Sequence, residues 1–87
     1  GSHPNPCNPS ASLAFSLARE AAVELAIYAL DGRRVARIAS GQRFSAGQHT
    51  LRWDGRNDHG DPLASGLYLV RFAAAGARAE SKLTLLK

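Results

Sequence analysis

Apolar and polar residues alternate with a period of two along most of this chain. Residues 12–17 and 23–28 each place an apolar side chain at every second position. This spacing is typical of β-strands that bury one face. The alanines between residues 20 and 29 would also suit a helix, because Ala and Glu are strong helix formers. The period of two and the following Asp31-Gly32 pair, a strong hairpin signal, favour strand.

The remaining elements are predicted from the same alternation and from turn residues. Residues 34–39 predict a third strand, in which Val35 and Ile38 break the alternation and indicate a β-bulge or an edge strand. Residues 40–47 contain two glycines and predict a connector. Further strands are expected over residues 49–53, 66–73 and 80–87, the middle one being the most apolar and therefore central.

This series of short strands predicts an all-β fold. About six or seven strands with turn signals at regular spacing and no clear helix are typical of an antiparallel, immunoglobulin-like β-sandwich. A chain of 87 residues makes one small domain. Residues 1–3 are interpreted as the remnant of a purification tag. Residues 4–11 are a proline-rich lead-in or linker end, and residues 12–87 form the single domain.

The charge and composition exclude several classes of partner. The formal net charge of +4 comes mostly from arginine. A basic patch would indicate nucleic acid, but arginines scattered along the chain favour solvated strand faces, so no nucleic-acid partner and a monomer are expected. No apolar run reaches the length of a transmembrane helix. The single cysteine, Cys7, excludes an internal disulfide and a cysteine-based zinc cluster.

The long turn from Asp54 to Ser65 is the one candidate metal site. Its oxygen donors are Asp54, Asn57, Asp58 and Asp61. Calcium binds six to eight oxygens, so these side chains could hold it. Asp and Asn are also turn formers that accept hydrogen bonds from their own backbone. The turn therefore predicts a structural connector, with calcium as the alternative and no other cofactor.

No residue pattern of an enzyme is present. The chain lacks a paired general acid and base, a supported Ser/His/Asp set and a glycine-rich phosphate loop, so catalysis is not expected. β-Sandwiches can bind sugars through exposed aromatics, and Tyr28, Trp53 and Tyr68 are candidates. However, Trp53 and Tyr68 are in phase with core residues, which makes a carbohydrate-binding module a minor alternative.

Several motifs, in order and spacing, resemble a known family. They are PNPCNPS, IYALDGRRV, AGQHTLRWDGRNDHGDPLASGLYLVRF and the terminal KLTLLK. This combination is similar to the immunoglobulin-like domains related to the flagellar hook-capping protein (FlgD-type). These overlap with the C-terminal sorting domains of the type IX (Por) secretion system. The chain departs from the family pattern at Cys7, where the family usually has Phe.

The resemblance implies a non-catalytic C-terminal module of a larger secreted bacterial protein. Such a module is recognised by the outer-membrane secretion machinery, after passage through the periplasm of a Gram-negative-type cell, and is then cleaved or used as an anchor at the cell surface. A structural or interaction spacer, contacting neighbouring domains, is the alternative. The residues that match sorting positions are Pro4, Asn5, Pro6, Gly66, Tyr68, Lys82 and Lys87.

Overall fold

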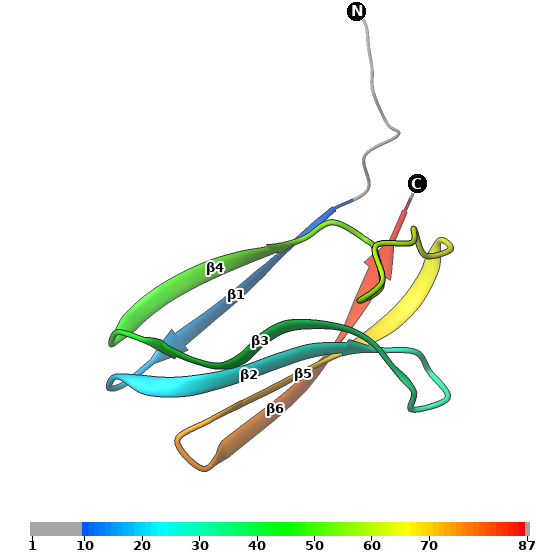
Figure 1. Ribbon diagram of the computed structural model, residues 1–87. Coiled ribbons are helices and arrows are strands. Elements are labelled where there is room, and N and C mark those ends of the chain that lie inside the picture. Colours follow the sequence, from blue (N-terminus) through cyan, green and yellow to red (C-terminus); the bar gives the residue numbers. More distant parts are fainter. Residues whose placement is uncertain (1–9, 87) are drawn as a thin grey trace, which may run out of the picture.

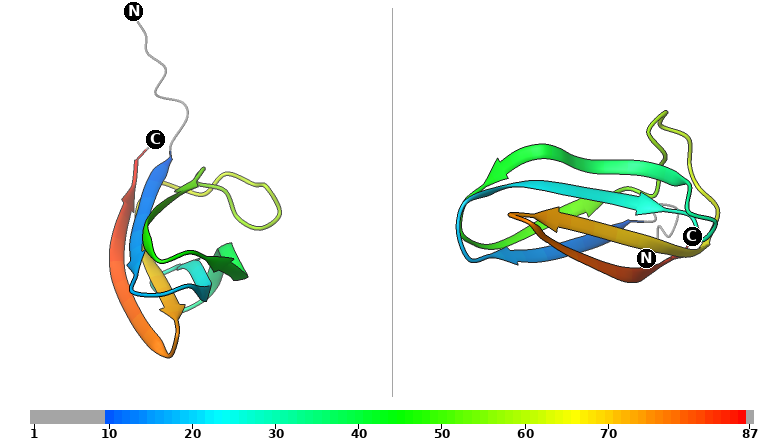
Figure 2. Two further views of the ribbon diagram at one scale, coloured as in Figure 1. Left: turned by 90° about the vertical axis from the view of Figure 1, so that its left-hand side faces the viewer. Right: turned by 90° about the horizontal axis from the view of Figure 1, so that it is seen from below.

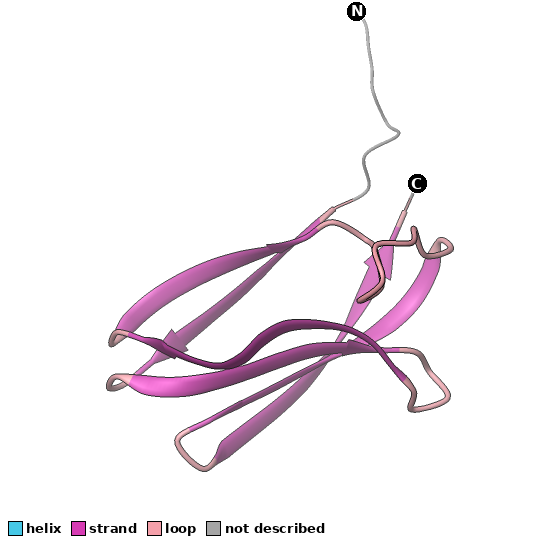
Figure 3. Ribbon diagram, viewed as in Figure 1, coloured by secondary structure: helices cyan, strands magenta, loops and turns pink. Residues whose placement is uncertain are grey.

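The computed structural model describes residues 10–86, which form an all-β domain without helices (Figures 1 and 3). The predicted antiparallel β-sandwich is thus confirmed. Because no helix is present among these residues, none could cross a membrane. The six strands are β1 (Ala11–Leu17), β2 (Ala21–Tyr28), β3 (Arg34–Phe44), β4 (Gly47–Trp53), β5 (Gly66–Ala74) and β6 (Ala77–Leu85).

The strands form two antiparallel sheets that face each other (Figure 2). β1 and β4 make a two-stranded sheet, and the other four strands follow the order β3-β2-β5-β6. β5 therefore lies inside its sheet, as its dense apolar sequence predicted, and β3 and β6 are the edges. The first strand of the chain and the last belong to different sheets.

The core lies between the two sheets and takes one side chain from every second position of the strands. Val23, Leu25 and Ile27 of β2 are almost fully buried, and the polar or small residues between them face outward. Across the core, β1 contributes Leu13 and β4 contributes Trp53. The remaining buried apolar residues are Ala21, Ala36, Ala39, Tyr68, Val70, Ala74 and Leu85.

β3 is longer and more irregular than the sequence predicts. Residues 40–44 were expected in a connector, but they continue the strand to Phe44. The pairing with β2 skips Val35, Ile38 and Gly41, so each is an extra residue in β3. Gly41 has a φ of +81° and is accommodated as a bulge within the ladder rather than as a turn. The bulge and edge position predicted from Val35 and Ile38 are both observed.

The β5–β6 hairpin turn is also shorter than expected. Ala74 pairs with Ala77 across a turn that contains only Ala75 and Gly76. Both have positive φ, 51° and 81°, as in a type I′ turn, which matches the twist of the flanking strands. β6 therefore begins at Ala77 rather than at Glu80.

Some residues named from the sequence lie outside the described part of the chain. These are the tag remnant, most of the proline-rich lead-in with Pro4, Asn5, Pro6 and Cys7, and the terminal Lys87.

Candidate functional site

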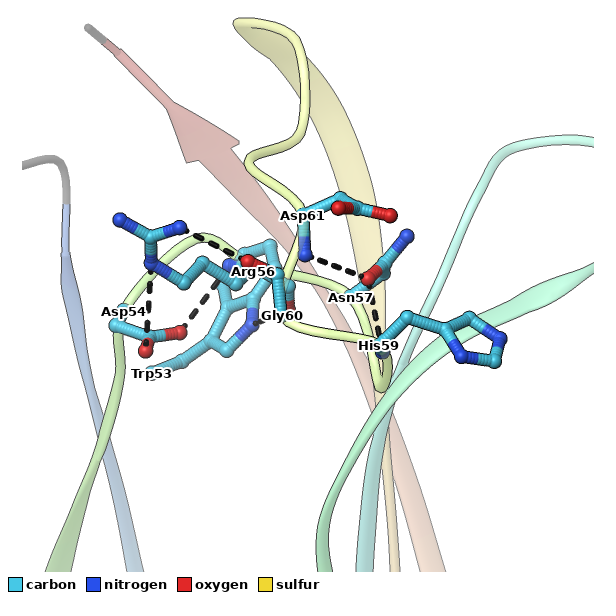
Figure 4. A network of polar contacts seen from close by, with 7 residues as sticks. All are labelled: Trp53, Asp54, Arg56, Asn57, His59, Gly60 and Asp61. Carbon is cyan, nitrogen blue, oxygen red and sulfur yellow. Dashed lines mark hydrogen bonds and ion pairs between the residues drawn. The ribbon is translucent and has the colours of Figure 1, made fainter.

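The long turn between β4 and β5 is held together by its own Asx side chains (Figure 4). The Asp54 carboxylate accepts the backbone N–H of Arg56 at 3.1 Å. The Asn57 amide oxygen accepts two backbone N–H groups, those of His59 at 2.9 Å and Asp61 at 3.0 Å. These are the local hydrogen bonds by which Asp and Asn stabilise turns, so the predicted connector role of these residues is observed.

Asp58 connects the same turn to the edge strand β3. Its carboxylate accepts the backbone N–H of Arg37 at 2.8 Å, and its own N–H donates to the carbonyl oxygen of Val35 at 3.1 Å. A carboxylate oxygen also lies 3.8 Å from Arg34 Nε. The turn thus pairs with the β3 edge at its bulged residue, as a short piece of strand would.

The four calcium candidates are not gathered around one point in space. Oxygens of Asp54, Asn57 and Asp58 each accept a backbone N–H, the first two from within the turn and the third from β3. Within the described turn, no hydrogen bond or ion pair of the Asp61 carboxylate joins it to the other three candidates; its backbone N–H, not its carboxylate, contacts Asn57 (Figure 4). Among residues 10–86, no group of three or more His, Cys, Asp or Glu side chains is arranged to hold a metal ion. Calcium binding by the turn is the untested alternative to the connector, and a titration can decide between them.

Two aromatic residues anchor the turn at its ends. Trp53 and Tyr68 pack edge to face with ring centroids 5.8 Å apart, at 2% and 9% exposure. The Trp53 indole N–H donates to the carbonyl of Arg56 at 2.9 Å, and the Tyr68 hydroxyl donates to the carbonyl of Ala64 at 2.7 Å. Their ring faces are buried and cannot stack on a sugar. The carbohydrate-binding alternative therefore loses two of its three aromatic residues.

The third aromatic, Tyr28, is covered by a cation. The Arg71 guanidinium carbon lies 4.4 Å from the centre of the Tyr28 ring. Arg71 also donates to the Glu80 carboxylate at 2.7 Å, and this hydrogen bond raises the pKa of Arg71 above its ordinary value. This group of three side chains sits on the outer face of the four-stranded sheet.

Three of the sorting candidates meet in the β5–β6 hairpin. Gly66 pairs with Leu85, Tyr68 pairs with Leu83, and Lys82 pairs with Leu69. Tyr68 and Leu85 point into the core, whereas Lys82 is exposed. The first two candidates therefore hold the last strand in place, and Lys82 presents a charge on its surface.

β6 offers an open strand edge. It pairs with β5 on one side, and no strand of the described chain pairs with the other side. Between β6 and β1 runs a groove of about 420 Å³, lined by residues 12–16 of β1 and 79–83 of β6, with apolar side chains of β2 and β5 beneath. Unpaired strand edges beside an apolar groove can take up an extended segment of another protein.

A second surface was missed by the sequence analysis, which treated the arginines as scattered. Arg34, Arg37, Arg71 and Arg78 line one hollow of about 580 Å³ on the outer face of the four-stranded sheet. The clustering of these arginines could in principle be predicted, because alternate positions of adjacent strands share a face of the sheet. Using it would have required the order and register of the strands.

Comparison with known proteins gives one family. The family model for the FlgD Ig-like domain matches residues 8–78, from before β1 to the start of β6. Comparison with individual curated proteins found no match. The family is one of non-catalytic structural domains, in agreement with the lack of a catalytic residue set in the sequence.

Proposed function

Because this chain belongs to the FlgD Ig-like domain family, we propose that it is a non-catalytic interaction module that acts as a type IX sorting and anchoring signal. In this role it directs a larger bacterial protein through the periplasm to the outer-membrane secretion machinery and then to the medium or the cell surface. The family membership supports the interaction module, and the motifs near both ends of the sequence support the sorting role.

The open edge of β6 is the observation that carries this proposal. A secretion receptor could add a strand to β6, because main-chain hydrogen bonds provide affinity and neighbouring pockets provide selectivity. Lys82 borders the groove between β6 and β1 and is exposed. Its ammonium group would favour an acidic receptor and orient its approach.

The export experiment must leave the core intact. Deleting residues 83–87 would remove Leu85, which is 1% exposed, so lost export could reflect unfolding alone. The sharper variant is Lys82→Glu with Thr84→Glu, because both positions are exposed on β6. The whole chain is fused to a reporter in a host that has type IX secretion, and secreted and cell-retained reporter are measured.

We expect the double variant to reduce export while its melting temperature stays close to that of the parent. Arg52→Glu, which reverses one exposed charge on β4 of the other sheet, is the control and should be exported normally. Parental export by the β6 variant would argue against recognition through this strand. If the unmodified fusion is retained as well, the sorting role itself is wrong.

A structural spacer is the second candidate. The β3 edge, where the Asp58 carboxylate accepts the backbone N–H of Arg37, favours a spacer. A protected edge is typical of a domain that lies beside other domains without pairing with them. The position of the domain in its full-length protein separates the two functions. An internal position, with a further folded domain after it, would support the spacer and oppose a terminal sorting signal.

A further inference from the structure

The outer face of the four-stranded sheet carries charges in ordered rows. In one row, Arg37 of β3 pairs with Ala26 of β2. Ala26 pairs with Arg71 of β5, and Arg71 pairs with Glu80 of β6. Directly paired residues on adjacent strands share a face of the sheet. The row therefore places one arginine on each side of a small alanine.

The next row also places an alanine between two charged residues, in this case a glutamate and an arginine. Glu24 of β2 pairs with Ala73 of β5, and Ala73 pairs with Arg78 of β6. Ala26 and Ala73 are the small residues at the centre of the face, and both line the hollow of about 580 Å³. The longer charged side chains around them form its rim.

Two of the four arginines in the hollow already have partners. Arg71 is paired with Glu80, at 2.7 Å, and Arg34 with Asp58, at 3.8 Å. Within residues 10–86, no ion pair or hydrogen bond holds the side chain of Arg37 or Arg78. Guanidinium groups present several donors in a planar fork that matches carboxylates. Arg37 and Arg78 are therefore the two groups available to an acidic ligand.

The carboxylates within the hollow decide the class of ligand. Glu24 and Glu80 both line it, so a uniformly negative polymer would meet like charges in the hollow as well as the arginines. A protein segment can place acidic side chains against Arg37 and Arg78 and a basic or neutral one beside Glu24. A partner that places a charge against a like charge of the surface is disfavoured. A surface of mixed charge therefore selects partners with the complementary pattern of charges.

We propose that this face is a docking surface for an acidic protein segment of mixed charge, with Arg37 and Arg78 as its contacts. The inference goes beyond the sorting role, because it concerns the outer face of the sheet and not the groove beside the β6 edge. Arg37 lies at the opposite edge of this sheet from β6. Normal export of an Arg37 variant would not contradict the docking proposal. Loss of peptide docking would likewise not contradict the sorting proposal.

The test uses the whole chain labelled with ¹⁵N and two short synthetic peptides. In the first, Glu alternates with Ala, and in the second, one central Glu is replaced by Lys. We expect saturable shifts of the backbone resonances around the hollow with both peptides, and tighter binding of the Lys-containing peptide than of the other. Changing Arg37 and Arg78 together to Gln should weaken binding by roughly fivefold to tenfold.

Two controls distinguish docking from general attraction to a basic protein. Arg19→Gln with Arg52→Gln removes the same charge away from the hollow and should leave the affinity nearly unchanged. Glu24→Gln should strengthen binding of the Glu/Ala peptide and abolish the preference for the Lys-containing one. Equal losses in the two arginine double variants would overturn the proposal, as would the absence of saturable shifts.

A polyanion arm tests the other ligand classes. Heparin and a single-stranded DNA oligonucleotide are titrated under the same salt conditions. Weaker binding of these polymers at the hollow supports the mixed-charge segment. Tighter binding than the peptides, with the same resonances shifted and the same dependence on Arg37 and Arg78, would assign the hollow to a polyanion instead.

Discussion

The Asp58 carboxylate accepts the backbone N–H of Arg37 at 2.8 Å, across 21 positions of the chain. This bond ties the long turn to the edge of β3, and the bond from the Asp58 N–H to the Val35 carbonyl completes the contact. Edge strands expose backbone groups that invite pairing with other chains. Asp58 occupies these groups at a bulged part of β3.

Replacing Asp58 with Ala should lower the free energy of unfolding by about 1–2 kcal/mol, because the Arg37 N–H loses its acceptor. Asp58→Asn retains an acceptor and should cost less. Urea denaturation measures both, and size-exclusion chromatography shows whether the uncovered edge promotes association. Asp61→Ala is the control, since the Asp61 carboxylate makes none of the contacts that hold the turn to β3. Equal effects at positions 58 and 61 would contradict this role for Asp58.

Tyr68→Phe should lower the free energy of unfolding by about 1 kcal/mol. The substitution removes the 2.7 Å hydrogen bond to the Ala64 carbonyl and leaves the ring against Trp53. Unfolding in urea can be followed by fluorescence, because Trp53 is the one tryptophan and is 2% exposed. Thr84→Val removes a hydroxyl from an exposed position of β6 and should have little effect. An unchanged midpoint for Tyr68→Phe would show that the turn does not depend on this bond.

Ala75→Asn should raise the free energy of unfolding by about 0.5–1 kcal/mol. Ala75 is the one residue other than glycine with positive φ among residues 10–86, and Asn tolerates this conformation better than Ala. Gly76→Ala should have the opposite sign, because it adds a Cβ where φ is +81°. Thermal and urea unfolding provide the comparison. Destabilisation by Ala75→Asn would exclude the type I′ geometry.

Calcium should leave the melting temperature unchanged, because the oxygens of Asp54 and Asn57 already accept backbone hydrogen bonds within the turn and Asp58 accepts one from β3. The measurement compares EDTA with millimolar calcium, and magnesium serves as the control ion. A rise specific to calcium would instead establish the metal site that the sequence left open, since a ligand that binds the folded state stabilises it.

Local features of this chain were predictable because they depend on neighbouring residues. The Asp31-Gly32 pair predicted the β2–β3 hairpin. In the structure, Gly32 has a φ of +91° and the Asp31 carboxylate accepts the N–H of Arg33 at 3.0 Å. The phase of Trp53 and Tyr68 with apolar neighbours likewise predicted their burial.

The features that were missed depend on which strands become neighbours. Nothing in the periodicity of β2 shows that Val23 will pair with Ala74 of β5, and the arginine face follows from that order and register. The extension of β3 was missed for another reason. Gly41 was interpreted as part of a connector, although a glycine with positive φ also fits a bulge.

The difference between the two edges of the four-stranded sheet limits how copies of this domain can associate. Bulges and Asp58 interrupt the β3 edge, whereas the β6 edge is continuous. Two copies that join through β6 would be related by a twofold axis, and the joined sheet would end in an interrupted β3 edge on each side. Such a pair is closed, because the same patch is used on both copies. Growth of this sheet into a filament is therefore blocked after the first step.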